Sequence, residues 1–201
     1  MKVRKLDNKV LAVLNAASTD ETRYVLQSVH IREDGKVEAT NGVLMLQAQL
    51  DMVEQGEIPG SIVGEVMDKE IIVPAEVARQ AVKQIPKSAS LPILEGAYIV
   101  GGGIQSTDLE TTHRTNFKPI EGVYPPLDNI IPAWRYDESR NLMLNPKVLK
   151  RILKASKVVR ATSIVFTLPP EGTELSGGTV ALVINNKAEP IVTGVFIAMS
   201  Y

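Results

Sequence analysis

The side chains of this sequence that are best suited to chemistry are basic residues grouped on predicted helices. The segment 146–160 begins with proline, which suits the first position of a helix, and it carries six basic residues and no acidic one. At about 100° per residue, its large apolar residues fall on one side of the helix and its basic residues on the other. The apolar side comprises Val148, Leu149, Ile152 and Leu153, and the basic side comprises Lys147, Lys150, Arg151, Lys154 and Lys157.

A second predicted helix, over residues 74–85, repeats this arrangement more weakly. Opposite its alanine and valine face it carries Arg79, Lys83 and, just past its end, Lys87. Such rows of lysine and arginine can bind the phosphates of a polyanion by screened, sequence-independent attraction. They can equally form a solvated face that keeps a protein soluble. Because two basic helices recur in one scaffold, the sequence favours neither interpretation over the other.

Side chains that support catalysis or metal binding are scarce. The chain has two histidines, His30 and His113, and no cysteine, which excludes a disulfide scaffold, a thiolate metal site and a cysteine nucleophile. Asp108 and Glu110 share a strand face, but a carboxylate pair alone does not indicate catalysis. The glycines at 101–103 lie between two predicted strands and indicate a hairpin turn, because a phosphate-binding loop precedes a helix. We therefore expect no enzymatic activity, no metal site and no cofactor.

The composition is that of an ordinary globular chain. It has 201 residues, of which 44% are hydrophobic and 22% charged, and a formal charge of −1. This balance excludes a globally basic nucleic-acid binder, although residues 1–75 carry eight basic and twelve acidic side chains, so the first third is acidic. The apolar stretch 10–17 is interpreted as part of an amphipathic helix, and no run reaches the ~18 apolar residues of a membrane span. We expect a cytoplasmic protein without a membrane partner.

An internal repeat divides the chain into three units with the element order β-α-β-β-β. In the first unit we expect a strand at 3–6, a helix at 8–17 and strands at 23–31, 37–40 and 43–50. In the second we expect a strand at 70–73, the helix at 74–85 and strands at 97–100, 104–107 and 112–117. In the third we expect a strand at 142–144, the helix from 146 and strands at 163–168, 179–184 and 191–199. This order predicts an α+β fold with antiparallel sheets and helices packed on one face.

One such unit is too small to build its own core, so we expect the units to pair. Residues 1–122 are predicted to form a complete domain from units 1–66 and 67–122. Residues 123–138, which contain three prolines, are predicted to be a linker on the surface. Residues 139–201 then form a half domain, which we expect to pair with another chain in a dimer or tetramer.

Four segments give the chain a family resemblance. Residues 18–26 (STDETRYVL) with the strand that follows, 39–45 (ATNGVLM), 121–132 (EGVYPPLDNIIP) and 194–199 (GVFIAM) are similar to segments of the bacterial DNA polymerase III beta subunit, or sliding clamp, family. The resemblance touches all three units. Two departures stand out: Val43 and Leu44 replace the family's His-Arg pair, and three units stand where a bacterial clamp has six.

The resemblance implies a DNA-clamp fold, in which two units make a domain and six domains close into a ring around duplex DNA. The helices of such a ring face the DNA, so the resemblance implies backbone contacts by Arg79, Lys83, Lys87, Lys147, Lys150, Arg151, Lys154 and Lys157. It further implies a non-enzymatic processivity factor in DNA replication, with a DNA polymerase or a clamp loader as partner. Partner binding is expected near Phe196, Met199 and Tyr201. The alternative is a clamp-fold interaction scaffold that forms oligomers and does not encircle DNA.

Overall fold

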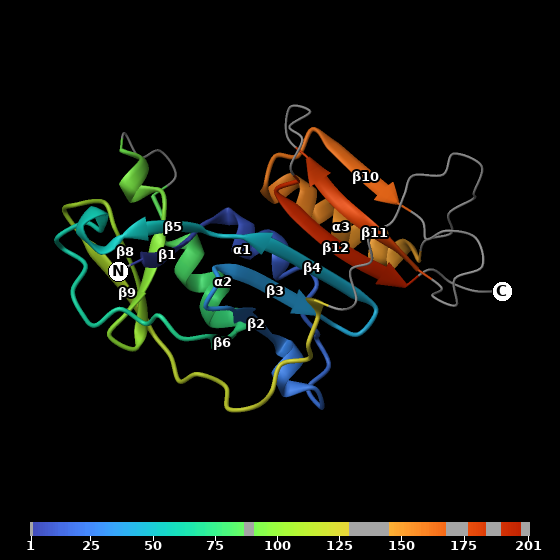
Figure 1. Cartoon of the computed structure of the whole chain (residues 1–201), viewed down its shortest axis with the longest axis horizontal. Helices are drawn as coiled ribbons and strands as arrows, with labels where there is room; N and C mark the ends of the chain where they lie inside the picture. The colour runs from blue at the N-terminus through green and yellow to red at the C-terminus, as the bar shows by residue number, and fades with distance from the viewer. Residues whose placement is uncertain (1, 87–90, 129–144, 168–176, 184–189, 198–201) are drawn as a thin grey trace.

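The computed structural model describes residues 2–86, 91–128, 145–167, 177–183 and 190–197 (Figure 1). The first unit contains β1 (Lys2–Leu6), α1 (Asn8–Val13), β2 (Ser28–Ile31), β3 (Lys36–Thr40), β4 (Leu44–Gln49) and β5 (Asp51–Glu54). The second contains β6 (Ile71–Pro74), α2 (Ala75–Lys83), β7 (Ala97–Val100), β8 (Gly103–Thr107) and β9 (Thr112–Asn116). The third contains α3 (Pro146–Val158), β10 (Ser163–Thr167), β11 (Gly177–Val183) and β12 (Val192–Ile197). Three 3-10 helices, η1 (Tyr24–Gln27), η2 (Gln55–Glu57) and η3 (Pro92–Leu94), complete the described elements.

The strands form two antiparallel sheets, and the first two units exchange strands between them. The five-stranded sheet has the order β5-β1-β7-β8-β9, and the seven-stranded sheet has the order β10-β11-β12-β4-β3-β2-β6. The first strand of the first unit, β1, therefore pairs with β7 of the second unit. In return the first strand of the second unit, β6, pairs with β2 of the first. This reciprocal exchange joins the two units, as expected for units too small to fold alone.

The third unit extends the sheet of the first. Its last strand, β12, pairs antiparallel with β4, so that Gly194 lies opposite Leu46 and Phe196 opposite Leu44. Its helix α3 packs on α1, which also packs on α2. This edge-to-edge pairing shows how the units are joined, but it does not test where each unit begins and ends. The domain boundaries expected from the sequence therefore remain a prediction.

The helices pack on one face of the seven-stranded sheet, as predicted (Figure 1). Alternate strand residues such as Leu44 and Leu46 point to the helices and share one continuous core with Val13, Ala78 and Ile152. The neighbouring strand residues point to the opposite face, which we call the outer face. Within the described ranges, no helix is both long and apolar enough to cross a membrane.

Three elements differ from the sequence prediction by more than two residues. The helix expected over 8–17 ends at Val13, where the side-chain amide of Asn15 bonds back to the carbonyl oxygens of Leu11 and Ala12 and competes with helical hydrogen bonds. The first half of the strand expected over 23–31 is the 3-10 helix η1. The acidic segment from Asp51, for which no strand was predicted, forms β5 against β1. The strand expected at 142–144 lies outside the described residues.

A connecting segment, residues 117–128, leads away from β9 and crosses the outer face of the seven-stranded sheet towards β3 (Figure 1). Tyr124 and Leu127 are buried there against Met45, Ile72 and Val195. The described part of the predicted linker, residues 123–128, is therefore packed against the sheet.

Candidate nucleic-acid interface

Helix α3 owes its position to its ends and to its apolar face. Pro146 occupies the first turn, and the side chain of Asn145 caps the helix by accepting a hydrogen bond from the backbone N–H of Lys147 at 2.9 Å. Val148 and Ile152 are buried in the common core. Leu153 departs from the predicted apolar side, since 44% of its surface is exposed.

The basic side of α3 is exposed along its length. The residues on it that lie open to solvent are Lys147, Lys150, Lys154 and Lys157. They follow one another at intervals of three and four residues, which places them on one face of the helix. The structure shows no acidic residue within α3. The row of lysines predicted from the sequence is therefore accessible to solvent.

Arg151 has a different environment from the lysines around it. It is half-buried, and its guanidinium Nη1 donates to the carbonyl oxygens of Asn15 at 3.2 Å and Ala17 at 3.1 Å, just beyond the end of α1. These bonds tie α3 to the end of α1. Arg151 therefore positions the helix, and a ligand would have to share a guanidinium that already has protein partners.

The basic residues of α2 are likewise placed in different environments. Arg79 is half-buried and forms an ion pair with Glu76 one turn earlier, at 2.9 Å between Nη1 and Oε2. Lys83 is exposed in the last turn of the helix. Lys87 lies outside the described residues. Of the three basic residues predicted near α2, Lys83 is therefore exposed and Arg79 is paired with a carboxylate.

A groove of about 500 Å³ brings part of both basic helices together. Arg79 of α2 lines it together with Arg151 and Lys154 of α3, and the polar residues Ser18, Thr19 and Gln27 lie alongside. Glu76 is the acidic residue in its lining. A groove with three cations, one carboxylate and several hydroxyl or amide groups can accept an anionic group such as a backbone phosphate.

The outer face carries a polar cluster that the sequence analysis missed. Glu38 has 2% of its surface exposed, and its carboxylate accepts hydrogen bonds from His30 Nδ1 at 2.8 Å and Gln47 Nε2 at 2.9 Å. The His30 ring stacks on Tyr124, with 5.0 Å between ring centroids. The Asp34-Gly35 hairpin was the available signal, because its register places His30 opposite Glu38.

Tyr124 and Asp128 fasten the connecting segment to this cluster. The Tyr124 hydroxyl oxygen accepts from the backbone N–H of Thr40 at 3.1 Å, and burial raises the pKa of this phenol. Asp128 forms an ion pair with Arg32 and a weaker one with Lys36. The hydrogen bond from Arg32 lowers the pKa of the Asp128 carboxyl. These contacts hold the segment in a defined position.

Of the three predicted partner-binding residues, Phe196 belongs to β12 at the junction with β4. Met199 and Tyr201 lie outside the described residues. The prediction of partner binding near these residues stays untested.

Comparisons with known proteins address the fold. No protein-family model matches the sequence. A beta sliding clamp from Synechocystis sp. is 26% identical over 183 residues, covering 87% of this chain and 45% of that protein. The beta clamp of H. pylori superposes with a TM-score of 0.63 at 9% identity, covering 100% of this chain and 66% of that one. The chain has the sliding-clamp fold.

Two further solved structures of sliding clamps also share the fold of this chain. The DNA polymerase beta subunit from Streptococcus pyogenes superposes with a TM-score of 0.61 at 13% identity, over 96% of this chain and 63% of that one. The DNA polymerase sliding clamp from Bacillus subtilis gives 0.60 at 14% identity, over 99% and 64%. The predicted resemblance and fold class are confirmed, and the chain is a divergent clamp-like protein. It spans about half the length of the curated relative that it matches.

Proposed function

We propose that this chain is a non-enzymatic, sliding-clamp-like accessory of DNA replication that binds the backbone of duplex DNA through α2 and α3. The observation that carries the proposal is the row of exposed lysines on α3, next to a groove that adds Arg79 and Arg151. Contacts from lysine side chains to phosphates carry no sequence information, which suits a protein that must move along DNA. The clamp fold supports the same assignment, with the helices on one face of the sheet.

The proposed partners and location follow from the same assignment. A DNA polymerase or a clamp loader is the expected protein partner, in the cytoplasm, and the region of Phe196, Met199 and Tyr201 is the proposed place of contact. No cofactor is needed, because binding and sliding require no bond to be made or broken.

Charge reversal on α3 tests the DNA-binding proposal. The double variant Lys150→Glu/Lys154→Glu should weaken binding to a duplex of random sequence, and the slope of log K against log salt should fall by about 2, one for each lost phosphate contact. The measurement is fluorescence anisotropy of labelled duplex at several salt concentrations. The matched control is Lys2→Glu/Lys118→Glu, which makes the same change in net charge at exposed lysines elsewhere. Equal losses in both variants, or no loss in either, would overturn the proposal.

We also propose that a second copy of the chain pairs with the third unit. In each of the first two units, the strand that follows the helix along the chain pairs with a strand of the other unit. These pairs are β2 with β6 and β7 with β1. The corresponding strand of the third unit is β10, and among the described strands it pairs with β11 alone. Val165 of β10 is 41% exposed and Leu153 of α3 is 44% exposed. A second copy of this unit would cover both side chains.

The alternative function is a clamp-fold interaction scaffold that forms oligomers without encircling DNA. Two observations favour it: Arg79 is already paired with Glu76, and Arg151 is bonded to the carbonyl oxygens of Asn15 and Ala17. The same anisotropy measurement separates the two functions, because a scaffold would bind no duplex even at low salt.

A further inference from the structure

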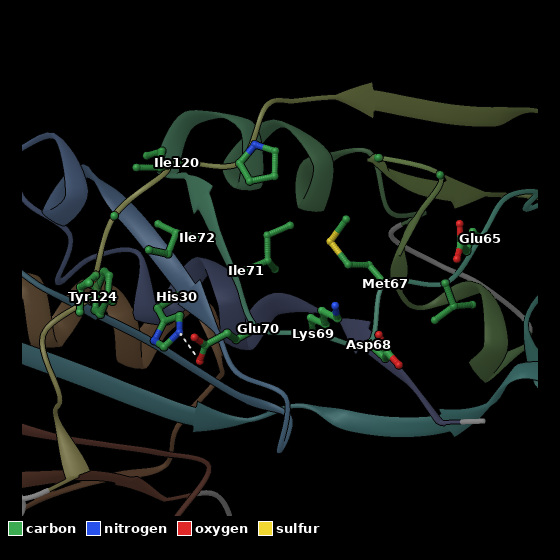
Figure 2. A pocket seen from close by; sticks show the side chains of 16 residues that line it. His30, Glu65, Met67, Asp68, Lys69, Glu70, Ile71, Ile72, Ile120 and Tyr124 are labelled. Carbon is green, nitrogen blue, oxygen red and sulfur yellow. Dashed lines mark ion pairs between the residues drawn. The ribbon is translucent and has the colours of Figure 1, made fainter.

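A second groove lies beside β6, the strand at one end of the seven-stranded sheet, and reaches the outer face at His30 and Tyr124. It has a volume of about 710 Å³, which is within the range of sites that bind small or extended ligands. The segment 65–72, the turn at Gly101 and Gly102, and the connecting segment line it. Figure 2 shows Met67 and Ile71 in the space between Ile120 on one side and Asp68, Lys69 and Glu70 on the other.

Both long walls of this groove are fixed by hydrogen bonds. Behind the first wall, the guanidinium of Arg4 donates to the carbonyl oxygens of Met67 and of Lys69, the latter at 2.8 Å. On the second wall, the backbone N–H of Ile120 donates to the carbonyl oxygen of Ile72 at 3.0 Å, and Tyr124 is bonded to Thr40. A ligand would therefore meet a preformed groove and would not have to order either wall.

The groove combines an apolar lining with an exposed apolar rim. Ile71 and Ile72 form part of its lining, and Met67 and Ile120 are half-buried beside them. On the rim, Val123 has 89% of its surface exposed although its neighbour Tyr124 is buried. The hydrogen bonds of Ile120 and Tyr124 anchor the connecting segment on both sides of Val123 and keep this side chain exposed to solvent. Such exposure is expected of a side chain that a partner covers.

The charges around the groove are mainly negative. Glu65, Asp68 and Glu70 line it and are exposed, whereas Lys69 is the one lysine or arginine among the described residues of its lining. His30 Nε2 lies 3.6 Å from Glu70 Oε2 at the inner end (Figure 2). Carboxylates repel phosphate groups and attract lysine and arginine, so this face is unsuited to nucleic acid and suited to a basic ligand.

We propose that this groove binds a short extended peptide segment of a partner protein, in which an apolar side chain is flanked by lysine or arginine. The apolar side chain packs among Met67, Ile71 and Val123, and the basic side chains pair with Glu65 and Asp68. The site is separate from the proposed DNA interface, because it shares no lining residue with the groove between α2 and α3. It gives the protein a place to hold a partner while the helix face is occupied.

Labelled peptides test this proposal on the intact chain. A fluorescein-labelled hexapeptide Lys-Lys-Leu-Ile-Lys-Lys should bind saturably at low salt, and its counterpart Glu-Glu-Leu-Ile-Glu-Glu should not. Val123→Ser should weaken binding of the basic peptide about fivefold or more by removing apolar contact area. Val43→Ser is the matched control, because Val43 is also an exposed valine, 45% exposed, on a different loop.

The charge contribution is tested by a second pair of variants. Glu65→Gln/Asp68→Asn should weaken binding about fivefold, since each exposed charge pair contributes little. Glu21→Gln/Glu110→Gln makes the same change in net charge at distant exposed sites and should leave binding unchanged. Equal binding of the acidic peptide, equal losses in the controls, or no saturable binding below about 1 mM would overturn the proposal. The Lys150→Glu/Lys154→Glu variant should bind the basic peptide normally, so that a failure of the DNA proposal is recognised separately.

Discussion

Arg4 is a buried cation held by backbone carbonyls. It lies in β1 with 2% of its surface exposed, and its guanidinium donates to the carbonyl oxygens of Ile31, Arg32, Met67 and Lys69. Burial lowers the pKa of this guanidinium, while the nearby carboxylates of Asp68 and Glu33 act in the opposite direction. The side chain joins β1 and the end of β2 to the segment that walls the outer groove.

Removal of this side chain should destabilise the protein. Arg4→Met keeps the aliphatic bulk but leaves four carbonyl oxygens without this donor, so the free energy of unfolding should fall by about 2–4 kcal/mol. Urea denaturation followed by circular dichroism measures the change. Lys2→Met, on the same strand but exposed, is the control and should change the free energy by less than about 0.5 kcal/mol. A loss in Arg4→Met no larger than in the control would show that the carbonyls find other partners.

At the residue scale, the sequence could predict exposure but not partners. Helical spacing correctly predicted that Lys150 and Lys154 are exposed, because the period of a helix is a local property. It did not predict that Arg151, between them, bonds to carbonyl oxygens near residue 15. The burial of Arg4 was missed for the same reason: its partners lie about 30 and 65 residues away along the chain.

At the scale of elements, the junction between β4 and β12 depends on a glycine. Gly194 faces β4 so closely that a Cβ added to it would overlap the carbonyl oxygen of Met45. Because that oxygen belongs to the backbone of the neighbouring strand, one of the two strands would have to move to accept a side chain. The third unit is therefore joined to the first by a contact that only glycine permits.

Gly194→Ala should loosen this junction and leave the first two units folded. The clash should cost about 1–3 kcal/mol and separate β12 from β4. Hydrogen exchange measures this effect as faster exchange of the amides of β4 that bond to β12, with unchanged protection in β7 and β8. Thr193→Ala, at the adjacent position, is the control and should leave exchange in β4 unchanged. Unchanged protection of β4 in Gly194→Ala would contradict the assigned role of the glycine.

Element order was largely predictable, whereas sheet order was not. The glycines at 101 and 102, for example, form the predicted hairpin turn between β7 and β8, because turn chemistry is local. The exchange of β1 and β6 between units, and the pairing of β12 with β4, join residues far apart in sequence and leave no local pattern. The predicted C-terminal end of α1 was too late. The alanines at 16 and 17 continue the apolar pattern and are buried, but they lie beyond the end of the helix.

At the scale of the whole molecule, the edge strand β10, which among the described strands pairs with β11 alone, predicts self-association. Light scattering at tens of micromolar should give at least twice the mass of one chain, since a second copy would cover Leu153 and Val165. Leu153→Glu/Val165→Glu should shift the protein to monomer, because burial of two carboxylates in the interface is unfavourable. Val43→Glu/Val123→Glu places the same charges at exposed valines elsewhere and serves as the control. A wild-type monomer at these concentrations would contradict the assembly.

The pairing of β12 with β4 also has a consequence for the time course of folding. Val192 pairs with Ala48, nearly 150 positions earlier in the chain, and closing so long a loop carries a large entropic cost. Contacts of this kind form slowly, and during synthesis the first two units leave the ribosome well before β12 exists. Until then, β4 presents an unpaired strand edge of the kind that promotes aggregation. We therefore expect the yield of folded protein to depend on how quickly β12 is made.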